Sequence, residues 1–195
     1  MKKLVLASNN PGKIREIAAL LAPLQIEVLP QSQFGVGEAQ EPHDTFIENA
    51  LAKARHAARH TGLPALADDS GICVNALGGA PGVHSALLAG APRSDERNNA
   101  RLLELLEPHA HRHAHYCCVL VLLRHATDPQ PLIAEGDWHG EILRGPRGSG
   151  GFGYDPLFLD TARGLTGAQM PLEEKNRVSH RGNALRLLVE RLRRE

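Results

Sequence analysis

Two adjacent carboxylates, Asp68 and Asp69, follow the apolar residues 63–67 and precede Ser70 and Gly71. Ionised carboxylates at the end of a buried strand are costly to fold unless they bind a divalent cation or take part in proton transfer. The same residue types are also typical of a turn in which an aspartate side chain caps the backbone. Taken alone, this segment leaves a catalytic or metal-binding site and a capped turn as equal alternatives.

A second candidate site is the segment Ser8-Asn9-Asn10-Pro11-Gly12-Lys13, between the first predicted strand and the first predicted helix. Backbone N–H groups and the dipole at a helix N-terminus bind anions, so this position suits phosphate. The segment lacks the Gly-x-x-x-x-Gly-Lys-Ser/Thr pattern of a Walker loop. The alternative is a turn capped by Asn10 with Pro11 at the first helical position.

Lysine is scarce in this chain, since the 22 Lys and Arg residues include only five lysines, and Lys2 and Lys3 lie at the N-terminus. The other three, Lys13, Lys53 and Lys175, each lie in a segment that carries another candidate feature. A compact ammonium is a point charge suited to phosphate oxygens, and arginine does not replace it geometrically. We interpret the three lysines as ligands of an anion. The alternative is chance placement on solvated faces.

Further polar residues lie in and before the second predicted helix. Glu48 is best explained as the capping-box partner of Thr45. Asn49 and Lys53 are four residues apart and therefore share a helix face. Glu41, in the preceding loop, is a candidate second metal ligand, with an exposed loop acid as the alternative.

The glycine-rich region before Phe152-Gly153-Tyr154-Asp155 allows the backbone to approach a ligand closely. The two aromatic rings could stack on a base while the aspartate accepts hydrogen bonds from it, and a hairpin with a core aromatic is the alternative. His180 and Arg181 are predicted in the first turn of the last helix, where cations oppose the helix dipole. Their placement indicates that an anion or an acceptor lies nearby, with solvent exposure as the alternative.

Histidines and cysteines give weaker indications. A run of histidines with period two would share one face of an extended segment, namely His109, His111, His113 and His115. Because no paired Cys or Glu in the sequence has ligand spacing, we interpret the run as a polar segment that enters a buried strand and not as a zinc site. The three cysteines are an odd number, and two of them, Cys117 and Cys118, are adjacent. This argues against a disulfide framework and places the pair in the core.

Composition restricts the class of protein. The chain has 195 residues, enough for a single domain over residues 1–195 with a sizeable core. Its formal net charge of zero gives no electrostatic footprint for a nucleic acid polymer or an anionic membrane. No segment approaches about 18 apolar residues, and the apolar run after Lys3 is too short for a signal peptide. We expect a soluble, cytoplasmic protein with no membrane partner.

Periodicity and caps predict alternating strands and helices. Strands are expected at residues 3–7, 115–124 and 132–143, the last interrupted at Gly136 and Gly140, and helices at residues 11–22, 45–62 and 94–107 and from near Ser179. Residues 30–43 are expected to form a loop. The fold class is α/β, with a central mixed sheet.

Seven motifs in this order resemble the inosine/xanthosine triphosphate pyrophosphatases, which hydrolyse non-canonical purine nucleotides. They are Ser8–Lys13, residues 46–50 with Lys53, residues 67–71, residues 76–82, residues 150–156, residues 174–176 and residues 179–182. The resemblance extends from residue 4 to about residue 190. It implies an elongated mixed sheet flanked by helices, two lobes around a nucleotide cleft, and a homodimer. It also implies Mg²⁺-dependent cleavage of ITP, dITP or XTP to the monophosphate and pyrophosphate, which cleanses the nucleotide pool.

The resemblance also implies roles for individual residues. Asp69 would bind the metal, together with Glu41, and act as the catalytic base. Triphosphate binding would fall to Ser8, Asn9, Asn10, Pro11, Gly12, Lys13 and Lys53, with Ser70 as a further substrate contact. The nucleoside would be bound by Phe152, Gly153, Tyr154, Asp155, Lys175, His180 and Arg181.

One departure concerns Leu87, which follows Ser85-Ala86 where the family carries a basic residue. The missing charge supports only the second of two alternatives. One is a pyrophosphatase for pyrimidine or other modified nucleotides, and the other is a nucleotide-binding module without catalysis.

Overall fold

The structure is a computed structural model that describes residues 2–194. Five α-helices and seven strands are assigned within these residues, together with four short 3-10 helices. In chain order they are β1 Lys3–Leu6, α1 Pro11–Leu21, η1 Ala22–Leu24, β2 Glu27–Pro30, η2 Gln31–Phe34, α2 Phe46–Thr61, β3 Ala65–Val74, η3 Asn75–Leu77, η4 Gly82–Leu87, α3 Asp95–Leu106, β4 His113–Leu123, β5 Leu132–Ile142, β6 Phe158–Asp160, β7 Leu165–Thr166, α4 Leu172–Val178 and α5 His180–Leu192.

The strands that the structure describes are hydrogen-bonded in the order β2-β1-β3-β4-β5-β6-β7. β1 runs parallel to both of its neighbours, with Val5 opposite Leu29 on β2 and opposite Ala65 on β3. β6 is antiparallel to β5 and to β7. The sheet is therefore mixed, and the predicted α/β class is confirmed.

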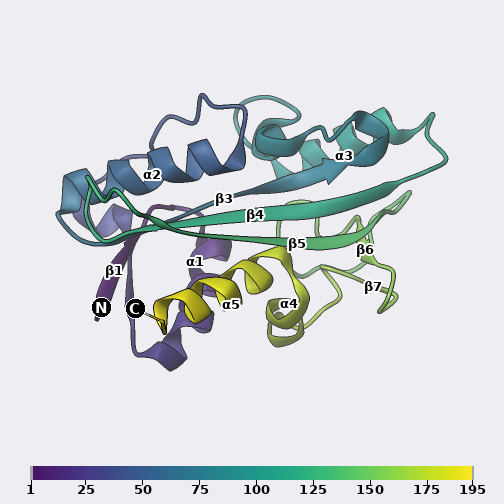
Figure 1. The fold of residues 1–195 in the computed structure, drawn as a ribbon. Coiled ribbons are helices and arrows are strands. Elements are labelled where there is room, and N and C mark those ends of the chain that lie inside the picture. Colours follow the sequence, from purple (N-terminus) through teal and green to yellow (C-terminus); the bar gives the residue numbers. More distant parts are fainter. Residues whose placement is uncertain (1, 195) are drawn as a thin grey trace. The chain divides into compact units, whose positions relative to one another are not determined.

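Two compact units divide the chain, and β3, β4 and β5 each contribute to both. The first unit comprises the residues up to Asp69, Cys118–Gly136, and the residues from Arg181 onward. In this unit α2 lies over one face of the sheet, and α1 and α5 lie over the other (Figure 1). Its core contains side chains from β1, β3 and β4 packed against α1 and α5, among them Leu6, Ile17, Leu66, Leu120 and Leu185.

The second unit comprises Ser70–Cys117 and Asp137–His180. It has its own hydrophobic core, which includes Ile72, Leu102, Tyr116, Trp138 and Phe158. The rings of Tyr116, Trp138 and Phe158 pack on one another with centroids 4.7–6.1 Å apart. A single domain over residues 1–195 stays a prediction.

Helix starts follow the predicted caps. Asn10 caps α1 with Pro11 in its first turn, and Ser94 caps α3 through the N–H of Arg97. Thr45 accepts from the N–H of Glu48 at the start of α2, and its hydroxyl donates to the Glu48 carboxylate at 2.6 Å. Gly62 ends α2 with φ +67°, a conformation that glycine adopts without a steric cost.

Several element predictions were wrong. β3 continues to Val74, so Asp68 and Asp69 lie inside a strand and not at its end, because pairing within the sheet prevails over turn propensity. Neither β2 nor α4 was predicted. The start of α5 at His180, after Ser179 closes α4, agrees with the prediction. β5 is continuous through Gly136 and Gly140.

The cysteines agree with the core positions predicted for Cys117 and Cys118. Within residues 2–194 none of the three cysteines forms a disulfide, and Cys117 and Cys118 are buried while Cys73 is partly exposed. None of the helices in the described part of the chain combines the length and the apolar character that a membrane span requires.

Candidate active site

The segment Ser8–Lys13 joins β1 to α1 in the first unit. The Asn10 side chain accepts from the N–H groups of Gly12 at 2.8 Å and Lys13 at 3.2 Å, and Ser8 Oγ accepts from the N–H of Asn10 at 3.2 Å. Two of the N–H groups expected to bind an anion are thus bonded to the cap. The segment presents the Lys13 side chain beside β3, where its ammonium forms an ion pair with Asp68.

Asp68 is completely enclosed by donors. Its carboxylate accepts from Arg181 Nε at 2.8 Å and from the Cys118 thiol at 3.1 Å, and it pairs with Lys13. Burial raises the pKa of this carboxyl, but the Arg181 guanidinium and the Lys13 ammonium lower it more, so the pKa lies well below its ordinary value. Asp68 is therefore ionised and serves to hold these cations.

Arg181, which is 1% exposed, connects α5 to β3 and α1. Its guanidinium pairs with Glu16 of α1 as well as with Asp68. Glu16 is 3% exposed and was missed from the sequence. The anions that the sequence predicted near the start of the last helix are supplied by the protein itself.

Asp69 lies next on β3 and has a different environment. Its Oδ1 accepts from Lys53 Nζ at 2.7 Å, while Oδ2 is buried and has no hydrogen-bond partner among the described residues. Burial, with a smaller contribution from Glu41, raises the pKa of Asp69 to about 6 against the lowering effect of Lys53 and Lys13. One oxygen of a buried carboxylate is thus left to bind a cation or a proton.

Lys53 of α2 joins Asp69 to Glu41. Its Nζ donates to Glu41 Oε2 at 3.0 Å, and the two carboxylates hold the pKa of Lys53 above its ordinary value although burial lowers it. The Glu41 side chain is 44% exposed. The Lys53 ammonium keeps the pKa of Glu41 below its ordinary value, although partial burial raises it. Glu41 therefore lies at the open side of this cluster.

Asn49 fixes the loop that carries Glu41. Its side chain accepts from the N–H of His43 at 3.1 Å and donates to the carbonyl of His43 at 3.0 Å. Asn49 is 1% exposed and lies four residues before Lys53 on α2, as its spacing predicted. Its role is to hold the loop before the helix, which the sequence did not indicate.

Charges in this cluster do not balance within the part of the chain that the structure describes. The carboxylates outnumber the cations by one, since Glu16, Glu41, Asp68 and Asp69 face Lys13, Lys53 and Arg181. A hard divalent cation binds carboxylate oxygens and would offset this excess. Together with the unpartnered Asp69 Oδ2, the excess of negative charge fits a metal site.

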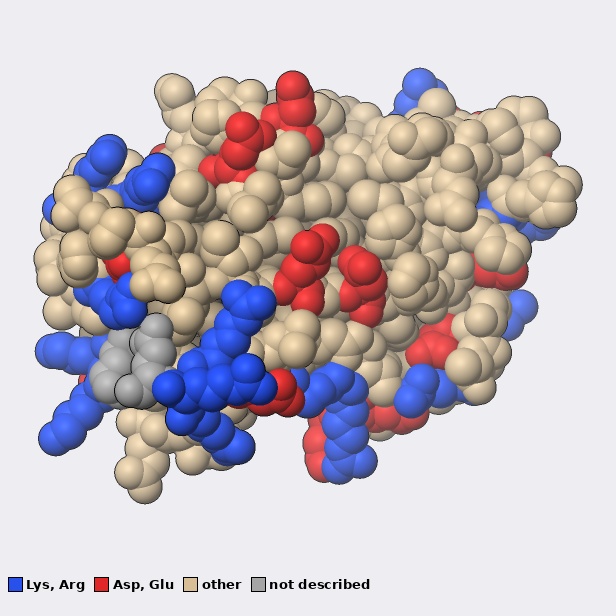
Figure 2. Space-filling model, in the orientation of Figure 1, with Lys and Arg blue, Asp and Glu red and all other residues tan. Residues whose placement is uncertain are grey.

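The three lysines singled out from the sequence are largely buried. The side chains of Lys13 and Lys53 are 16% and 11% exposed, and Lys175 is 3% exposed. On the face drawn in Figure 2, Lys and Arg side chains gather over α5, whose exposed basic residues are arginines. The three lysines selected by the sequence are thus held inside the structure, as ligand groups would be.

The predicted nucleoside-binding residues belong mainly to the second unit. Asp155, which is 2% exposed, accepts from the N–H of Phe152 at 2.8 Å and from Lys175 Nζ at 2.6 Å. The Lys175 ammonium lies 4.9 Å from the centroid of the Phe152 ring, a cation–π contact. A side chain at Gly151, where φ is +70°, would place its Cβ 2.1 Å from Asp155 Oδ2, so the turn requires glycine.

The loop around Gly153 is tied to α3. The N–H of Gly153 donates to Asp95 at 2.6 Å, and its carbonyl accepts from Asn99 at 2.9 Å. Tyr154 is buried in the core and donates its hydroxyl to the carbonyl of Ser85 at 2.7 Å. Tyr154 thus fits the core aromatic that the sequence left as the alternative, while Phe152 remains partly exposed.

His180 is buried against aromatic rings of the same unit. It stacks on Tyr116 with the centroids 4.6 Å apart and the planes 9° apart, and Trp138 lies beyond at 6.4 Å. Ser70, the first residue of this unit, is partly exposed on β3. The aromatic rings under His180 were not identified from the sequence.

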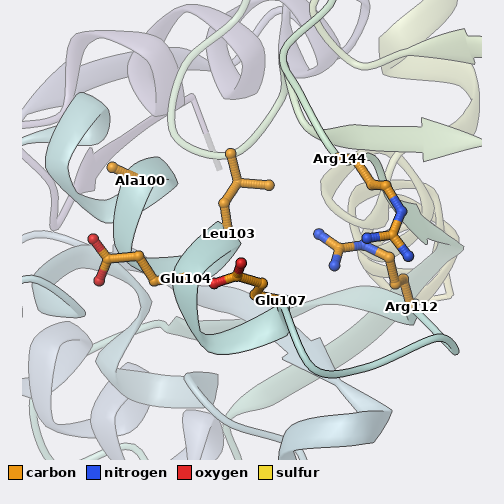
Figure 3. A pocket seen from close by; sticks show the side chains of 6 residues that line it. All are labelled: Ala100, Leu103, Glu104, Glu107, Arg112 and Arg144. Carbon is orange, nitrogen blue, oxygen red and sulfur yellow. The ribbon is translucent and has the colours of Figure 1, made fainter.

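A cavity of about 430 Å³ in the second unit contains none of the predicted residues. Figure 3 shows its lining, which comprises Ala100, Leu103, Glu104, Glu107, Arg112 and Arg144. Arg112 donates to the carbonyls of Leu106, Ile142 and Leu143, so its guanidinium holds the strand ends in place. We assign this cavity no ligand.

Comparison with known proteins gives a consistent result. The Ham1 family model matches residues 4–191. A dITP/XTP pyrophosphatase of Ralstonia nicotianae is 65% identical over 196 residues, covering 99% of this chain and 98% of the relative, and one of Nitrosomonas europaea is 64% identical, covering 98% and 95%. A HAM1 protein from Coxiella burnetii has a TM-score of 0.92 at 47% identity over the full length of both chains. The Staphylococcus aureus Ham1 protein has a TM-score of 0.87 at 38% identity, with 98% of each chain covered. This chain belongs to the Ham1 family.

Proposed function

We propose that this protein hydrolyses non-canonical purine nucleoside triphosphates, namely dITP, ITP and XTP, to the monophosphate and pyrophosphate. The dITP/XTP pyrophosphatases of Ralstonia and Nitrosomonas, which match almost the whole chain, support the substrate class. The cluster around Asp69 supports the chemistry, because it combines buried ammonium groups with a carboxylate of raised pKa.

One observation carries the proposal. Asp69 Oδ2 is buried without a hydrogen-bond partner among residues 2–194, beside a lysine that already occupies Oδ1. An acceptor left unsatisfied costs free energy, about 1–3 kcal/mol, so its retention is expected where a ligand completes it.

Asp69 and Glu41 fit Mg²⁺, because both present carboxylate oxygens around Lys53 in a cluster with excess negative charge. When bound there, Mg²⁺ would supply positive charge to the triphosphate oxygens. Asp69, whose pKa of about 6 keeps it mainly ionised at neutral pH, would accept a proton from the attacking water.

The lysines would then stabilise the phosphates. Lys53 and Lys13 lie on either side of the two aspartates and would offset the charge that develops on the leaving pyrophosphate. Segment Ser8–Lys13 and Ser70 would provide further contacts with the substrate. Arg181 would act as a positioning residue, since its guanidinium holds Asp68 and Glu16 and Asp68 in turn holds Lys13.

Recognition of the nucleoside would fall to the second group of residues. Phe152 offers a partly exposed ring with Lys175 over it, and Asp155 holds that lysine. His180, with its ring plane fixed by Tyr116, would donate to the 6-oxo group of inosine or xanthine. Adenine presents an amino donor at that position, so a donor would face a donor, and this mismatch discriminates strongly.

Two further properties belong to the proposal. We infer a homodimer from the resemblance of the seven motifs to the pyrophosphatase family, and a cytoplasmic location from the composition of the chain. Size-exclusion chromatography with light scattering tests the first, and imaging of the tagged protein in cells tests the second.

A substrate panel tests the proposal. Purified protein is assayed with Mg²⁺ against ITP, dITP, XTP, dUTP, GTP and ATP, and pyrophosphate is scored against phosphate. We expect pyrophosphate from the first three substrates and loss of turnover in Asp69→Asn, with partial survival of nucleotide binding. Asp44→Asn, an exposed loop acid of the same unit, is the matched control.

Other outcomes would contradict parts of the proposal. Activity that is flat across the panel or led by dUTP would indicate a pyrophosphatase for other nucleotides. Binding without turnover in the wild type would indicate a module that has lost catalysis. Undiminished pyrophosphate release by Asp69→Asn would refute the role of Asp69.

A further inference from the structure

Metal-ligating side chains face one another across β4 and β5 in the second unit. The strands are neighbours in the sheet, and the carbonyl of Arg112 accepts from the N–H of Ile142 at 2.9 Å. Counted from that bond along antiparallel strands, His113 is opposite Glu141, His115 is opposite His139, and Cys117 is opposite Asp137. Side chains two residues apart share a face of a strand, so these six groups lie on one face.

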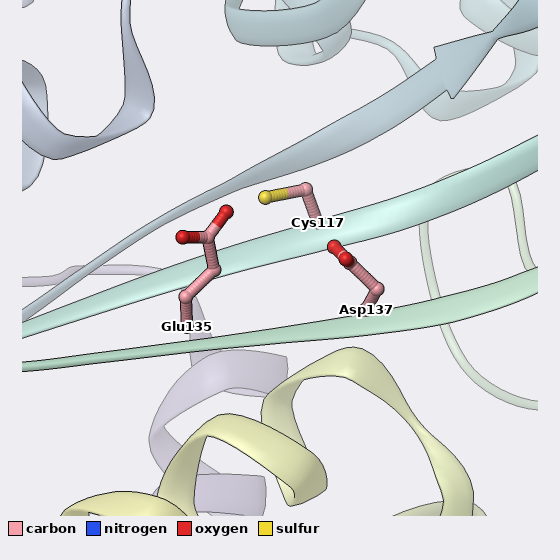
Figure 4. A group of neighbouring side chains, drawn as sticks. All are labelled: Cys117, Glu135 and Asp137. Atoms are coloured by element: carbon pink, nitrogen blue, oxygen red, sulfur yellow. The ribbon is translucent and has the colours of Figure 1, made fainter.

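Contacts between the side chains agree with this pairing. His113 Nε2 lies 3.6 Å from Glu141 Oε1, and the rings of His115 and His139 have centroids 5.3 Å apart with planes inclined by 32°. Cys117 and Asp137 offer ligand atoms within 4.8 Å of each other (Figure 4). The sequence showed only the alternate histidines of β4 and therefore suggested no completed site.

A cavity of about 430 Å³ lies over the first two pairs. It is lined by Asn75, His113, Ala114, His115, His139, Gly140, Glu141 and Thr161. Three histidines and one glutamate therefore line the same cavity. Cys117 is buried and does not line it, so the third pair lies outside the ligand set.

The spacing of the His115 and His139 rings fits a shared metal ion. Two imidazoles at tetrahedral positions, with zinc–nitrogen bonds of about 2.0–2.1 Å, have centroids about 5 Å apart. Among residues 2–194 the two rings contact each other and make no hydrogen bond to another protein group. Rotation of these side chains can therefore aim one nitrogen of each ring at a common point without breaking a hydrogen bond.

The chain contains a competing histidine pair on α2. The rings of His56 and His60 have centroids 4.3 Å apart. His56 Nε2 is already hydrogen-bonded to the carbonyl of Gly37 at 3.1 Å, and His60 Nδ1 to the carbonyl of His56 at 2.8 Å. A metal there would have to displace these bonds, so the pair on β4 and β5 is favoured.

We propose that His115 and His139, with His113 and Glu141 completing the set, bind one late first-row divalent cation, with zinc as the best fit. Imidazole suits zinc, copper and nickel, whereas Mg²⁺ prefers oxygen ligands. Zinc typically takes four protein ligands, or three protein ligands with a water in the open fourth position. The proposed Mg²⁺ site around Asp69 uses none of these residues, so this inference is independent of the proposed function.

Calorimetry on the full chain without a purification tag tests the site. Protein freed of metal with a chelator is titrated with zinc in the presence of excess Mg²⁺, which suppresses binding by carboxylates alone. We expect one zinc ion per chain. His115→Ala with His139→Ala should weaken binding by about 10- to 100-fold or more, the cost of removing even the outer partners of metal ligands.

Two controls separate this site from other histidines. His111→Ala removes a histidine of the same alternating run that does not line the cavity, and His56→Ala with His60→Ala removes the competing pair. Both should retain the wild-type affinity. Substitution of Co²⁺ should give the visible absorption of a low-symmetry nitrogen site, and the His115/His139 double variant should lose it while its circular dichroism stays unchanged.

Three results would overturn the proposal. One is the absence of stoichiometric zinc binding by the wild type up to millimolar zinc. Another is stoichiometric binding that survives loss of both His115 and His139. The third is binding that disappears with His56 and His60 instead. None of these readouts depends on nucleotide hydrolysis.

Discussion

Replacing Asp68 or Asp69 with asparagine removes one carboxylate from adjacent positions of β3, and the structure predicts opposite effects on stability. The pKa of Asp68 lies well below its ordinary value because Arg181 and Lys13 outweigh burial. The pKa of Asp69 is raised to about 6, mainly by burial. One charge therefore stabilises the folded chain, and the other destabilises it.

The magnitude for Asp69 follows from its pKa. The difference between a pKa of about 6 in the folded chain and the ordinary pKa of 3.8 corresponds to about 3 kcal/mol of destabilisation at pH 7. Asparagine removes this cost but also takes a charged partner from Lys53, which keeps Glu41 at 3.0 Å. We expect a net gain of about 1–2 kcal/mol, or a rise in Tm of about 2–8 °C.

For Asp68→Asn we expect the opposite effect, a loss of stability. Arg181, Lys13 and Cys118 all donate to the Asp68 carboxylate. An asparagine amide would offer them only one acceptor oxygen, and its NH2 group would face donors. Removing one partner of a buried ion pair costs about 3–5 kcal/mol. The Tm of Asp68→Asn should therefore fall by about 6–20 °C.

Thermal unfolding of the two variants and the wild type in a chelator at pH 7 measures both effects. Metal must be absent, because a cation bound to the folded state would add stability of its own. The amount by which the Tm of Asp69→Asn exceeds that of the wild type should decrease as the pH falls from 7 to 4. Because the pKa of Asp69 is raised in the folded chain, its ionised carboxylate destabilises the folded chain fully above about pH 6 and no longer does so below pH 3.8.

Equal loss of stability in the two variants would refute the reasoning, because it would mean that both carboxylates act as structural ion-pair partners. A neutral Asp68→Asn would show that Arg181 does not depend on this carboxylate. Either result would remove the physical distinction between the structural and the functional aspartate.

Other substitutions test separate contacts. Glu41→Gln should raise the Mg²⁺ concentration for half-maximal activity by about tenfold or more, measured by titration, while Glu38→Gln, an exposed acid of the same loop, should leave it unchanged. Gly151→Ala, whose Cβ would lie 2.1 Å from a carboxylate oxygen of Asp155, should cost about 1–3 kcal/mol in urea unfolding, and an unchanged midpoint would contradict the contact. Asp128→Asn should cost about 1–2 kcal/mol at pH 7, because a buried carboxylate loses charge-assisted bonds to a half-exposed arginine and to two backbone N–H groups. Hydrogen bonds from Arg124 lower the pKa of Asp128. The difference in unfolding free energy between Asp128→Asn and the wild type should therefore narrow as the pH falls below about 4, and a difference that stays constant would argue against an ionic contribution.

Local signals predicted much of the fold. Asn10 and Thr45 cap the helices that they were expected to cap, and the third helix starts after Ser94 as expected, because capping depends on a side chain and N–H groups two or three residues away. Short elements carried too little periodicity: β2 has four residues and ends at Pro30, and α4 has seven residues after Pro171.

Contacts between distant residues could not be predicted in this way. Glu16 and Arg181 are separated by 165 positions, and nothing in the local sequence of α1 indicates that this glutamate is buried beside a guanidinium. The pairing of β4 with β5 likewise brings His139 and Glu141 opposite histidines that had no ligand partner within their own segment. The lysines were predictable because their scarcity marked the positions of Lys13, Lys53 and Lys175.

The most direct test of the central claim compares kcat/KM for dITP and XTP with that for dATP and dGTP, in the wild type and in Asp69→Asn, with Mg²⁺ and with pyrophosphate as the measured product. Our account predicts that the wild type prefers dITP and XTP and that Asp69→Asn loses turnover with all four nucleotides while it remains folded. Comparable wild-type rates with dATP and dGTP, or wild-type rates in Asp69→Asn, would contradict it.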